Sequence, residues 1–501
     1  MPLLDTITHR AEVKQHRPWP RVPVAEEGWH QAIDLLVQGR CTLLALWADA
    51  PAVHMALLGG DRDDVAVLSY TCKNNQYPSV GAKHPPALRP ERAIRDLSGL
   101  EAAGTTDARP WLDLGFWRVR HPLGKQGPAR KPVPYEFLPV EGEGLHQIPV
   151  GPVHAGIIEP GHFRFTANGE HVVRLEQRLG WVHKGIERLM EGATLEEAAK
   201  LASRTSGDST VAYAFAFAQA AEAALQVKVP QRAIYLRALM AELERLANHF
   251  GDIGAICNDA SFSLMHAQCG ILRERTLRAA EVSFAHRLMM DVIIPGGVAR
   301  DIAADGISQI AALLAEVRHV FPRLIELYDN TASLQDRTVS TGIVNSELAR
   351  QFGAGGYVGR ASSRTFDTRR AIAYPPYDKL SFEVPVLDAG DVNARVWIRI
   401  REVEQSLSLI EQILSALPKG AIRVPLGDTK ACEGLGIAEA FRGDVLVWLR
   451  IDGKGHLARC HLRDASWFQW PLLEAAVEGN IVADFPLCNK SFNCSYSGHD
   501  L

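Results

Sequence analysis

The segment from residue 204 to residue 209 reads Arg-Thr-Ser-Gly-Asp-Ser and brings a cation, hydroxyls and a carboxylate together. Side chains of these types can stabilise a developing negative charge and transfer protons, so the segment is a candidate for acid–base chemistry. It lies between two stretches of helical patterning, and Ser206 or Asp208 could instead cap the helix that starts near Ser209. Spacing alone favours the capping role. The chain shows no Ser-His-Asp order and no nucleophile elbow.

Two histidines form a second candidate. His154 and His162 flank a turn at residues 156–161, so both imidazoles could face one cleft as proton donors or ligands. Histidine pairs at this spacing more often have a structural role, and both interpretations stay open.

A glycine-rich segment at residues 353–359 is followed by a cluster of arginines. A G-x-G-x-x-G phosphate loop would need glycine at position 358, which is Val358, so a tight loop is the favoured prediction. The basic residues that surround Asp367 are Arg360, Arg364, Arg369 and Arg370. They could hold an anion or a partner's carboxylate, but ion pairs that pin the loop are the favoured interpretation.

The eight cysteines are scattered and never form C-x-x-C; they are Cys41, Cys72, Cys257, Cys269, Cys432, Cys460, Cys488 and Cys494. Zinc and iron–sulfur sites need thiolates at short spacings, so no such site is expected in this chain. The first residues lack the apolar core of a signal peptide. We therefore expect a reducing, cytoplasmic compartment.

The composition is that of a globular protein. A chain of 501 residues with 47% hydrophobic content has core for about three domains. The 54 Lys and Arg against 58 Asp and Glu give a net charge of -4 without blocks of like charge, which argues against a nucleic acid partner. No stretch reaches the roughly 20 apolar residues that a bilayer span needs.

Prolines divide the chain. The Pro-rich segment 126–150 predicts an extended linker between a small α+β domain at 1–125 and a second domain at 151–501. In the second domain, residues 161–165 and 171–175 predict a β-hairpin. Helical patterning over 180–334 predicts a bundle, with the clearest apolar spacing at 231–250.

The C-terminal third alternates in type. An irregular stretch at 353–381 precedes a predicted helix at 392–417, a β-rich region at 437–462 with a turn at Asp452 and Gly453, and a short helix at 467–478. The predicted fold class is α+β: a small N-terminal α+β domain, then a helical-bundle domain with a peripheral hairpin and a small sheet.

The order of these pieces resembles a known family nearly end to end. The chain is similar to the fused large subunit of energy-converting membrane-bound NiFe hydrogenases of the formate hydrogenlyase type, and to the 49-kDa quinone-pocket subunit of complex I with its 30-kDa partner fused in front. The motifs that carry the resemblance lie at residues 91–99, 121–123, 151–156, 159–163, 183–187, 229–233, 246–249, 295–298, 360–369 and 390–395. The resemblance implies a 30-kDa-like domain at 1–125 and a hydrogenase-large-subunit-like domain at 151–501.

The departures from the family pattern concern the metal ligands. The hydrogenases of the family hold nickel and iron with four thiolates, in R-x-C-G-x-C-x-x-x-H and D-P-C-x-x-C-x-x-R. In register, this chain has Ser206 and Ser209 at the first two cysteines, Tyr213 at the histidine, and Ser495 and Gly498 at the last two cysteines. Because serine hydroxyls stay protonated near neutral pH, we expect no metal on this chain. Cys488 and Cys494 lie nearby but off register.

Complex I subunits also lack the cysteines and use the cavity for a quinone head group. They carry a tyrosine just after the R-x-D step, where this chain has Gly207, whereas His162 matches their pocket histidine. The resemblance therefore implies a redox subunit that reduces a quinone or similar acceptor, and it supports the quinone only in part.

The resemblance assigns roles to the residues. Arg204 would stabilise anionic charge, and His162, Asp208 or Tyr213 would relay protons. The expected pocket also includes His154, Ser206, Ser209 and Ser495. We expect Asp208 to lie buried beside Arg204.

The family also implies the setting. We expect a peripheral subunit on the cytoplasmic face of the membrane, with an iron–sulfur small subunit, a ferredoxin-like subunit and antiporter-like membrane subunits as partners that move protons or sodium. The iron–sulfur cluster would belong to the partner, and quinone is a candidate substrate. The alternatives are a scaffold or ion-coupling subunit with a degenerate site, and a hydrogenase with atypical ligands.

Overall fold

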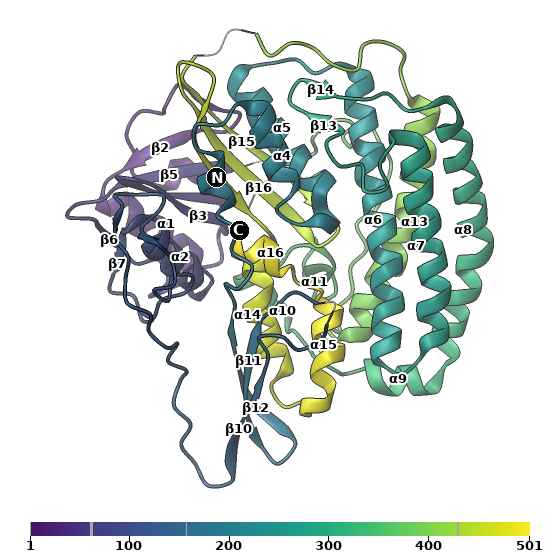
Figure 1. The fold of residues 1–501 in the computed structure, drawn as a ribbon, viewed down its shortest axis with the longest axis horizontal. Coiled ribbons are helices and arrows are strands. Elements are labelled where there is room, and N and C mark those ends of the chain that lie inside the picture. Colours follow the sequence, from purple (N-terminus) through teal and green to yellow (C-terminus); the bar gives the residue numbers. More distant parts are fainter. Residues whose placement is uncertain (1, 61–63, 157, 428–429) are drawn as a thin grey trace.

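The computed structural model describes residues 2–60, 64–156, 158–427 and 430–501. It is 44% helical and 19% strand, arranged as several small sheets beside a bundle of long helices. The predicted α+β class is confirmed. Figure 1 shows the N-terminal sheet on the left, the bundle on the right, and the C-terminal helices between the bundle and a projecting β-ribbon.

The N-terminal part folds around one four-stranded sheet. Its strands are β2 (Arg21–Val24), β3 (Thr42–Asp49), β4 (Ala52–Leu58) and β5 (Val65–Thr71), in the order β2-β5-β4-β3. Helices α1 (Glu26–Val37) and α2 (Leu88–Ser98) contribute to its core, where Trp29 is fully buried. The apolar runs of β3 to β5 are buried on both faces, since a second sheet covers the other side.

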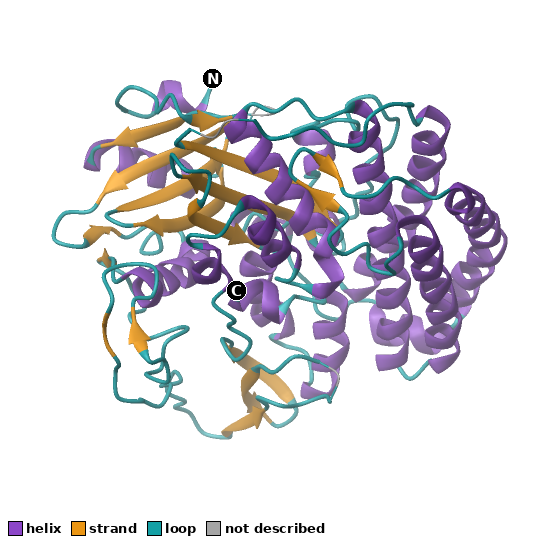
Figure 2. Ribbon diagram, turned by 45° about the horizontal axis from the view of Figure 1, so that its top comes forward, coloured by secondary structure: helices purple, strands orange, loops and turns teal. Residues whose placement is uncertain are grey.

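That second sheet comes mostly from the C-terminal region. It has the order β1-β15-β16-β17, formed by β1 (His16–Arg17), β15 (Cys432–Ala440), β16 (Gly443–Ile451) and β17 (Leu457–Arg463). The two sheets face each other through Trp47 and Trp448, whose ring centroids lie 5.5 Å apart, and Figure 2 shows their strands side by side. The predicted turn at residues 452–453 is confirmed between β16 and β17.

Five long helices form the bundle: α5 (Thr210–Leu225), α6 (Gln231–Asp259), α7 (Ser263–Phe284), α8 (Ala304–Asn330) and α13 (Val392–Ala416). The helix predicted from residue 231 is confirmed and continues nine residues beyond the predicted end at 250. The Ala-rich α5 lies against β15, where Gly434 and Gly436 admit its backbone: a Cβ on Gly434 would lie 1.9 Å from the Ala220 carbonyl oxygen.

The predicted hairpin is confirmed as β11 (His162–Asn168) and β12 (His171–Arg178). The end of the Pro-rich segment adds a third strand, β10 (Leu145–Val150), to this ribbon. The segment predicted as a linker, 126–150, is therefore strand-paired at both ends, through Gly127–Pro128 and through β10, and has no regular secondary structure in most of the part between them.

The remaining elements are short. They are η1 (Leu3–Thr6), β6 (Gln76–Pro78), η2 (Pro85–Ala87), β7 (Glu101–Ala103), β8 (Val119–Arg120), β9 (Gly127–Pro128), α3 (Ile186–Met190), α4 (Leu195–Ser203), η3 (Gly207–Ser209), β13 (Ile293–Ile294), β14 (Gly297–Val298), α9 (Ala332–Thr338), α10 (Ser346–Gln351), α11 (Gly356–Arg360), α12 (Thr368–Ala371), α14 (Ser466–Val477), η4 (Val482–Asp484), α15 (Phe485–Phe492) and α16 (Tyr496–Asp500). Among the described residues, none of the helices has both the length and the apolar character required for a membrane span.

Candidate functional site

Three turns that are distant in the sequence meet at the centre of the molecule. The turn before α5 carries Ser206 and Asp208, the turn between β15 and β16 carries Arg442, and the segment before α16 carries Ser495. The Ser206 and Ser495 hydroxyl oxygens lie 3.0 Å apart. The fold therefore brings together two positions that are 289 residues apart in the chain.

Asp208 is held by Arg442 in a two-pronged ion pair. The guanidinium Nη1 and Nη2 donate to the two carboxylate oxygens at 2.8 and 2.5 Å, and the Ser206 hydroxyl donates to Oδ1 at 2.7 Å. Although burial raises the pKa of Asp208, Arg442 and Ser206 bring it below its usual value. The carboxylate stays ionised, and a fixed anion–cation pair results.

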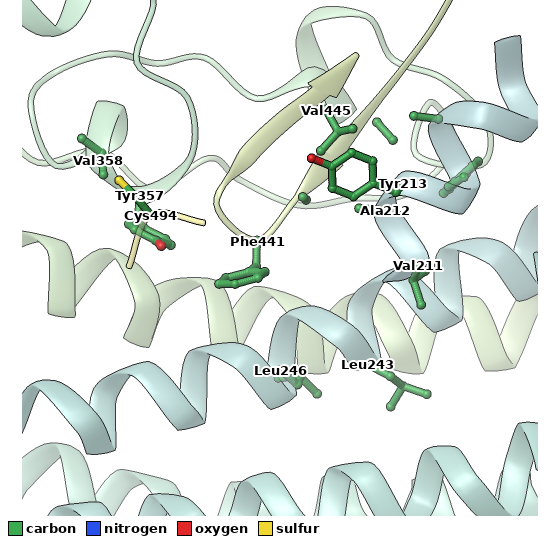
Figure 3. Close-up of a cluster of buried hydrophobic side chains, with 14 of the residues drawn as sticks. Val211, Ala212, Tyr213, Leu243, Leu246, Tyr357, Val358, Phe441, Val445 and Cys494 are labelled. Carbon is green, nitrogen blue, oxygen red and sulfur yellow. The ribbon is translucent and has the colours of Figure 1, made fainter. Parts of the chain in front are cut away.

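The hairpin turn fixes Arg442. Ala440 and Gly443 are the last paired residues of the hairpin, so Phe441 and Arg442 form its tip. Figure 3 shows Phe441 at this tip with Tyr357 on one side and Tyr213 on the other. The Phe441 ring packs against Tyr357 and His249, which anchors the turn. Only 4% of the Arg442 side chain is exposed.

A second, fully buried pair joins Tyr213 to Asp464. The Tyr213 hydroxyl donates to Asp464 Oδ2 at 2.8 Å, and the Ser466 amide donates to Oδ1 at 2.8 Å. Burial, reinforced by the charge of Asp464, holds the pKa of Tyr213 well above its ordinary value. Tyr213 is thus a hydrogen-bond donor in its neutral form.

Glu244 caps α5. Its carboxyl oxygens accept from the Val211 and Ala212 amides at 2.7 and 3.1 Å. The interpretation that Ser206 or Asp208 caps this helix is wrong, because their side chains bind Ser495 and Arg442 instead. The cap comes from the neighbouring helix α6, which sequence spacing cannot reveal.

Arg204 does not lie beside Asp208 as expected. It donates to Asp291 at 2.5 and 2.7 Å, and 41% of its side chain is exposed. Because Arg204 ends α4 on the solvent side, it binds the nearest carboxylate there. The cation that faces Asp208 is Arg442, which lies 234 residues further along the chain. Asp208 itself is half-buried rather than buried, since 36% of its side chain is exposed.

The two histidines lie on the ribbon side of the site. His154 Nε2 is 3.3 Å from the Tyr496 hydroxyl, next to Ser495. His162 contacts the Gly151 carbonyl through Nδ1, Arg164 through Nε2, and the Phe137 ring. Burial lowers the pKa of both imidazoles. His154 thus borders the cluster, whereas His162 contacts residues of the ribbon and the linker.

The loop at residues 353–381 is pinned by ion pairs, as the favoured interpretation predicts. Arg360 binds Glu402 and Glu439, and Arg369 binds Asp367 and Glu242. All six side chains are buried. Of the glycine-rich segment 353–359, residues 353–355 form the predicted tight loop, whereas residues 356–359 belong to the short helix α11.

Comparison with known proteins gives relatives over most of the chain. Formate hydrogenlyase subunit 5 of Escherichia coli is 33% identical over 85% of this chain and 77% of its own length. An NADH-quinone oxidoreductase subunit of Roseiflexus is 31% identical over 68% of this chain and 94% of its own length. The chain belongs to the family of these hydrogenase and NADH-quinone oxidoreductase subunits. The sequence model of the respiratory-chain NADH dehydrogenase 49 Kd subunit matches residues 260–433.

A solved structure supports the same family. A chain of the membrane-bound sulfane sulfur reductase, an archaeal respiratory membrane complex, superposes with a TM-score of 0.68 at 25% identity, over 73% of this chain and all of its own. The resemblance inferred from the motifs is thereby confirmed.

The residues at the metal-ligand positions of this family do not fit nickel and iron. Ser206 and Ser495 are bonded to each other, and Ser495 also accepts from the Gly498 amide. At Gly498 a Cβ would lie 2.7 Å from Asp464 Oδ2, so the carboxylate fills the space of a fourth ligand. Among the described residues, no three His, Cys, Asp or Glu side chains are grouped to hold a metal ion.

Cys488 and Cys494 do not supply replacement ligands. Both are buried, and burial raises the pKa of Cys488 to about 12 and that of Cys494 further. The Cys494 sulfur faces the Gln469 side-chain oxygen at 3.9 Å. Neither thiol is poised to become the thiolate that a soft metal needs.

The sequence patterns did not predict three residues of the site: Arg442, Asp464 and Glu244. Gly443 next to Arg442 signals a turn between two apolar segments, so the hairpin tip had a local signal, but the contact of Arg442 with Asp208 had none. Asp464 and Glu244 had none, since each binds a residue on another element, 251 and 33 residues away.

Proposed function

We propose that this chain is the peripheral redox-linked large subunit of a membrane-bound respiratory complex, and that its central site supplies protons for the reduction of a quinone or similar acceptor. One observation carries the proposal. Where the family has four thiolates, this chain has a hydrogen-bonded cluster with two carboxylates, Asp208 paired with Arg442 and Asp464 paired with Tyr213. Such a cluster can move protons and stabilise anions.

In this proposal, electrons arrive from the iron–sulfur cluster of a small-subunit partner. Reduction of a quinone takes two electrons and two protons and gives a quinol. Arg442 stabilises negative charge on the acceptor oxygen, the role first expected of Arg204, and Tyr213 holds a hydroxyl proton next to Asp464. Asp208 keeps Arg442 in place.

The acceptor would approach from the exposed side of Asp208. A cavity of about 130 Å³ reaches Gly207 and Asp208. It is smaller than the roughly 300–1,000 Å³ of ligand pockets, so a ring-sized acceptor needs additional space. We therefore place the acceptor between this subunit and the partner that donates electrons. A ferredoxin-like subunit and antiporter-like membrane subunits complete the proposed complex on the inner face of the membrane.

A second candidate function is that of a scaffold or ion-coupling subunit. The burial of Tyr213 and Ser206, whose exposed fractions are 0% and 3%, favours it. A hydrogenase with atypical ligands is disfavoured by the side chains that surround Gly498.

The test is metal analysis of the purified intact complex followed by an acceptor assay. We expect iron without stoichiometric nickel, and reduction of a water-soluble quinone by the reduced complex. Nickel at one per subunit would overturn the proposal in favour of a hydrogenase. Iron without nickel and without reduction of any quinone or sulfur acceptor would establish the scaffold function instead.

A further inference from the structure

A cavity connects the surface with a buried carboxyl group next to the central site. It lies between α6, α7 and residues 287–289, and has a volume of about 130 Å³. Arg273, Arg287 and Gly207 line it at the exposed end, and Glu244 lines it in the interior. This volume accommodates roughly four water molecules.

Glu244 differs from other carboxylates that are buried on its own helix and on the neighbouring helices. Glu222, Glu242 and Glu402 each bind an arginine. Among the described residues, no lysine, arginine or histidine nitrogen forms an ion pair with Glu244. A carboxyl buried without a cation favours its protonated form.

Charged and polar groups from several elements face Glu244, and their effects on its pKa oppose one another. Burial raises the pKa of Glu244 to about 8, opposed by the amides of Val211 and Ala212. The charge of Asp208 contributes to this rise, and the charge of Arg245 on the same helix opposes it. Arg273 from α7 and Arg287 from the following loop line the same cavity. The raised pKa favours the protonated form of Glu244 near neutral pH.

Glu244 is also coupled to the Asp208 turn. The Asn248 side chain donates to the backbone oxygens of Asp208 at 2.7 Å and of Glu244 at 2.9 Å. Asp208 and Glu244 line the same cavity. A proton released by Glu244 into the cavity therefore has a short path to the Asp208–Arg442 pair.

We propose that Glu244 takes up protons from solvent through this cavity and delivers them to the acceptor at the central site. The inference rests on the proposed function and names its proton entrance. In each delivery the Glu244 O–H bond breaks, the proton passes through cavity water to the acceptor anion, and the carboxylate regains a proton from solvent. The electrons come from the partner's iron–sulfur cluster, so Glu244 moves protons alone.

The test compares the intact complex with its Glu244→Gln and Glu244→Asp variants. Glutamine keeps an oxygen that accepts from the α5 amides, but it cannot release a proton. We measure reduction of a water-soluble quinone from about pH 5 to about pH 9, together with the infrared band of protonated carboxyl groups. Glu281→Gln on the exposed face of α7 is the matched control.

For the wild type we expect a rate that falls as pH rises through about 8, and a carboxyl band that disappears over the same range. Glu244→Gln should lose that band and slow the reaction at least tenfold at low pH, whereas Glu244→Asp should restore part of the rate with a shifted pH profile. Wild-type rate and pH profile in Glu244→Gln would overturn the inference.

If the wild-type complex reduces no acceptor, the proposed function fails, and the infrared band decides the proton site separately. A band that titrates near pH 8 and is absent in Glu244→Gln supports Glu244 as a proton-binding group. A band unchanged in the variant refutes it.

Discussion

The Tyr213 hydroxyl lies 2.8 Å from Asp464 Oδ2, the same oxygen that would lie 2.7 Å from a Cβ at position 498. Tyr213 replaces the family histidine and Gly498 replaces a family cysteine. One carboxylate thus connects two departures from the hydrogenase pattern. The two positions are therefore linked through the Asp464 carboxylate within one hydrogen-bonded network.

Replacing Tyr213 by phenylalanine tests this network. The change removes the donor to Asp464 and leaves a buried carboxylate with one fewer hydrogen bond. We expect a loss of about 1–3 kcal/mol in the free energy of unfolding, measured by chemical denaturation of the full chain. Unchanged stability would mean that Asp464 does not depend on Tyr213. Tyr328→Phe, which removes a buried hydroxyl far from the site, serves for comparison.

A side chain at position 498 should disturb the same carboxylate. Gly498→Ala places a methyl group within 3 Å of Asp464 and Ser495, and overpacking of this kind costs about 1–3 kcal/mol. Gly270→Ala in α7 is the control, because nothing lies within 4 Å of its Cβ position. We expect the melting temperature to fall in the first variant and to hold or rise in the second. Equal melting temperatures would contradict the described packing.

Asp208→Asn tests whether the central ion pair matters more for acceptor reduction than an exposed ion pair does. It removes the negative charge that faces Arg442, so we expect acceptor reduction by the intact complex to fall at least tenfold. Asp291→Asn is the matched control, since it disrupts the exposed pair with Arg204, and such pairs contribute about 0.2–1 kcal/mol. An equal loss of rate in both variants would show that the Asp208 pair has no special role.

The stability of the chain should depend on pH through Glu244. Its folded pKa of about 8 lies above its ordinary value of 4.5, so the folded state binds more protons between these values and stability falls as pH rises. We expect Glu244→Gln to gain stability relative to the wild type between about pH 5 and about pH 9, by at most about 5 kcal/mol. Denaturation midpoints at both pH values measure the difference. A constant difference would contradict the raised pKa.

Local pattern in the sequence predicts part of this structure. The helices from residues 231 and 392 were predictable because apolar spacing within each segment decides their burial. The register of the family motifs also placed Ser206 and Ser495 at one site, as the structure shows. The partners of Asp208 and Tyr213 were not predictable, since they lie 234 and 251 residues away on or beside the second sheet. The prediction that Arg204 lies beside Asp208 was wrong, because proximity in the sequence does not decide which way a side chain at the end of a helix points.

The pairing of β1 with β15 has a consequence for synthesis on the ribosome. Arg21, the first residue of β2, binds Glu433 next to this pairing at a separation of 412 residues. At roughly 5–20 residues per second, the N-terminal segment waits on the order of 20 to 80 s before its partner strand emerges. During that interval β1 and the face of the first sheet that carries Trp47 are uncovered. A newly made chain is therefore most exposed to aggregation and to chaperone binding before residue 432 has been translated, and truncation before this point should leave an insoluble product.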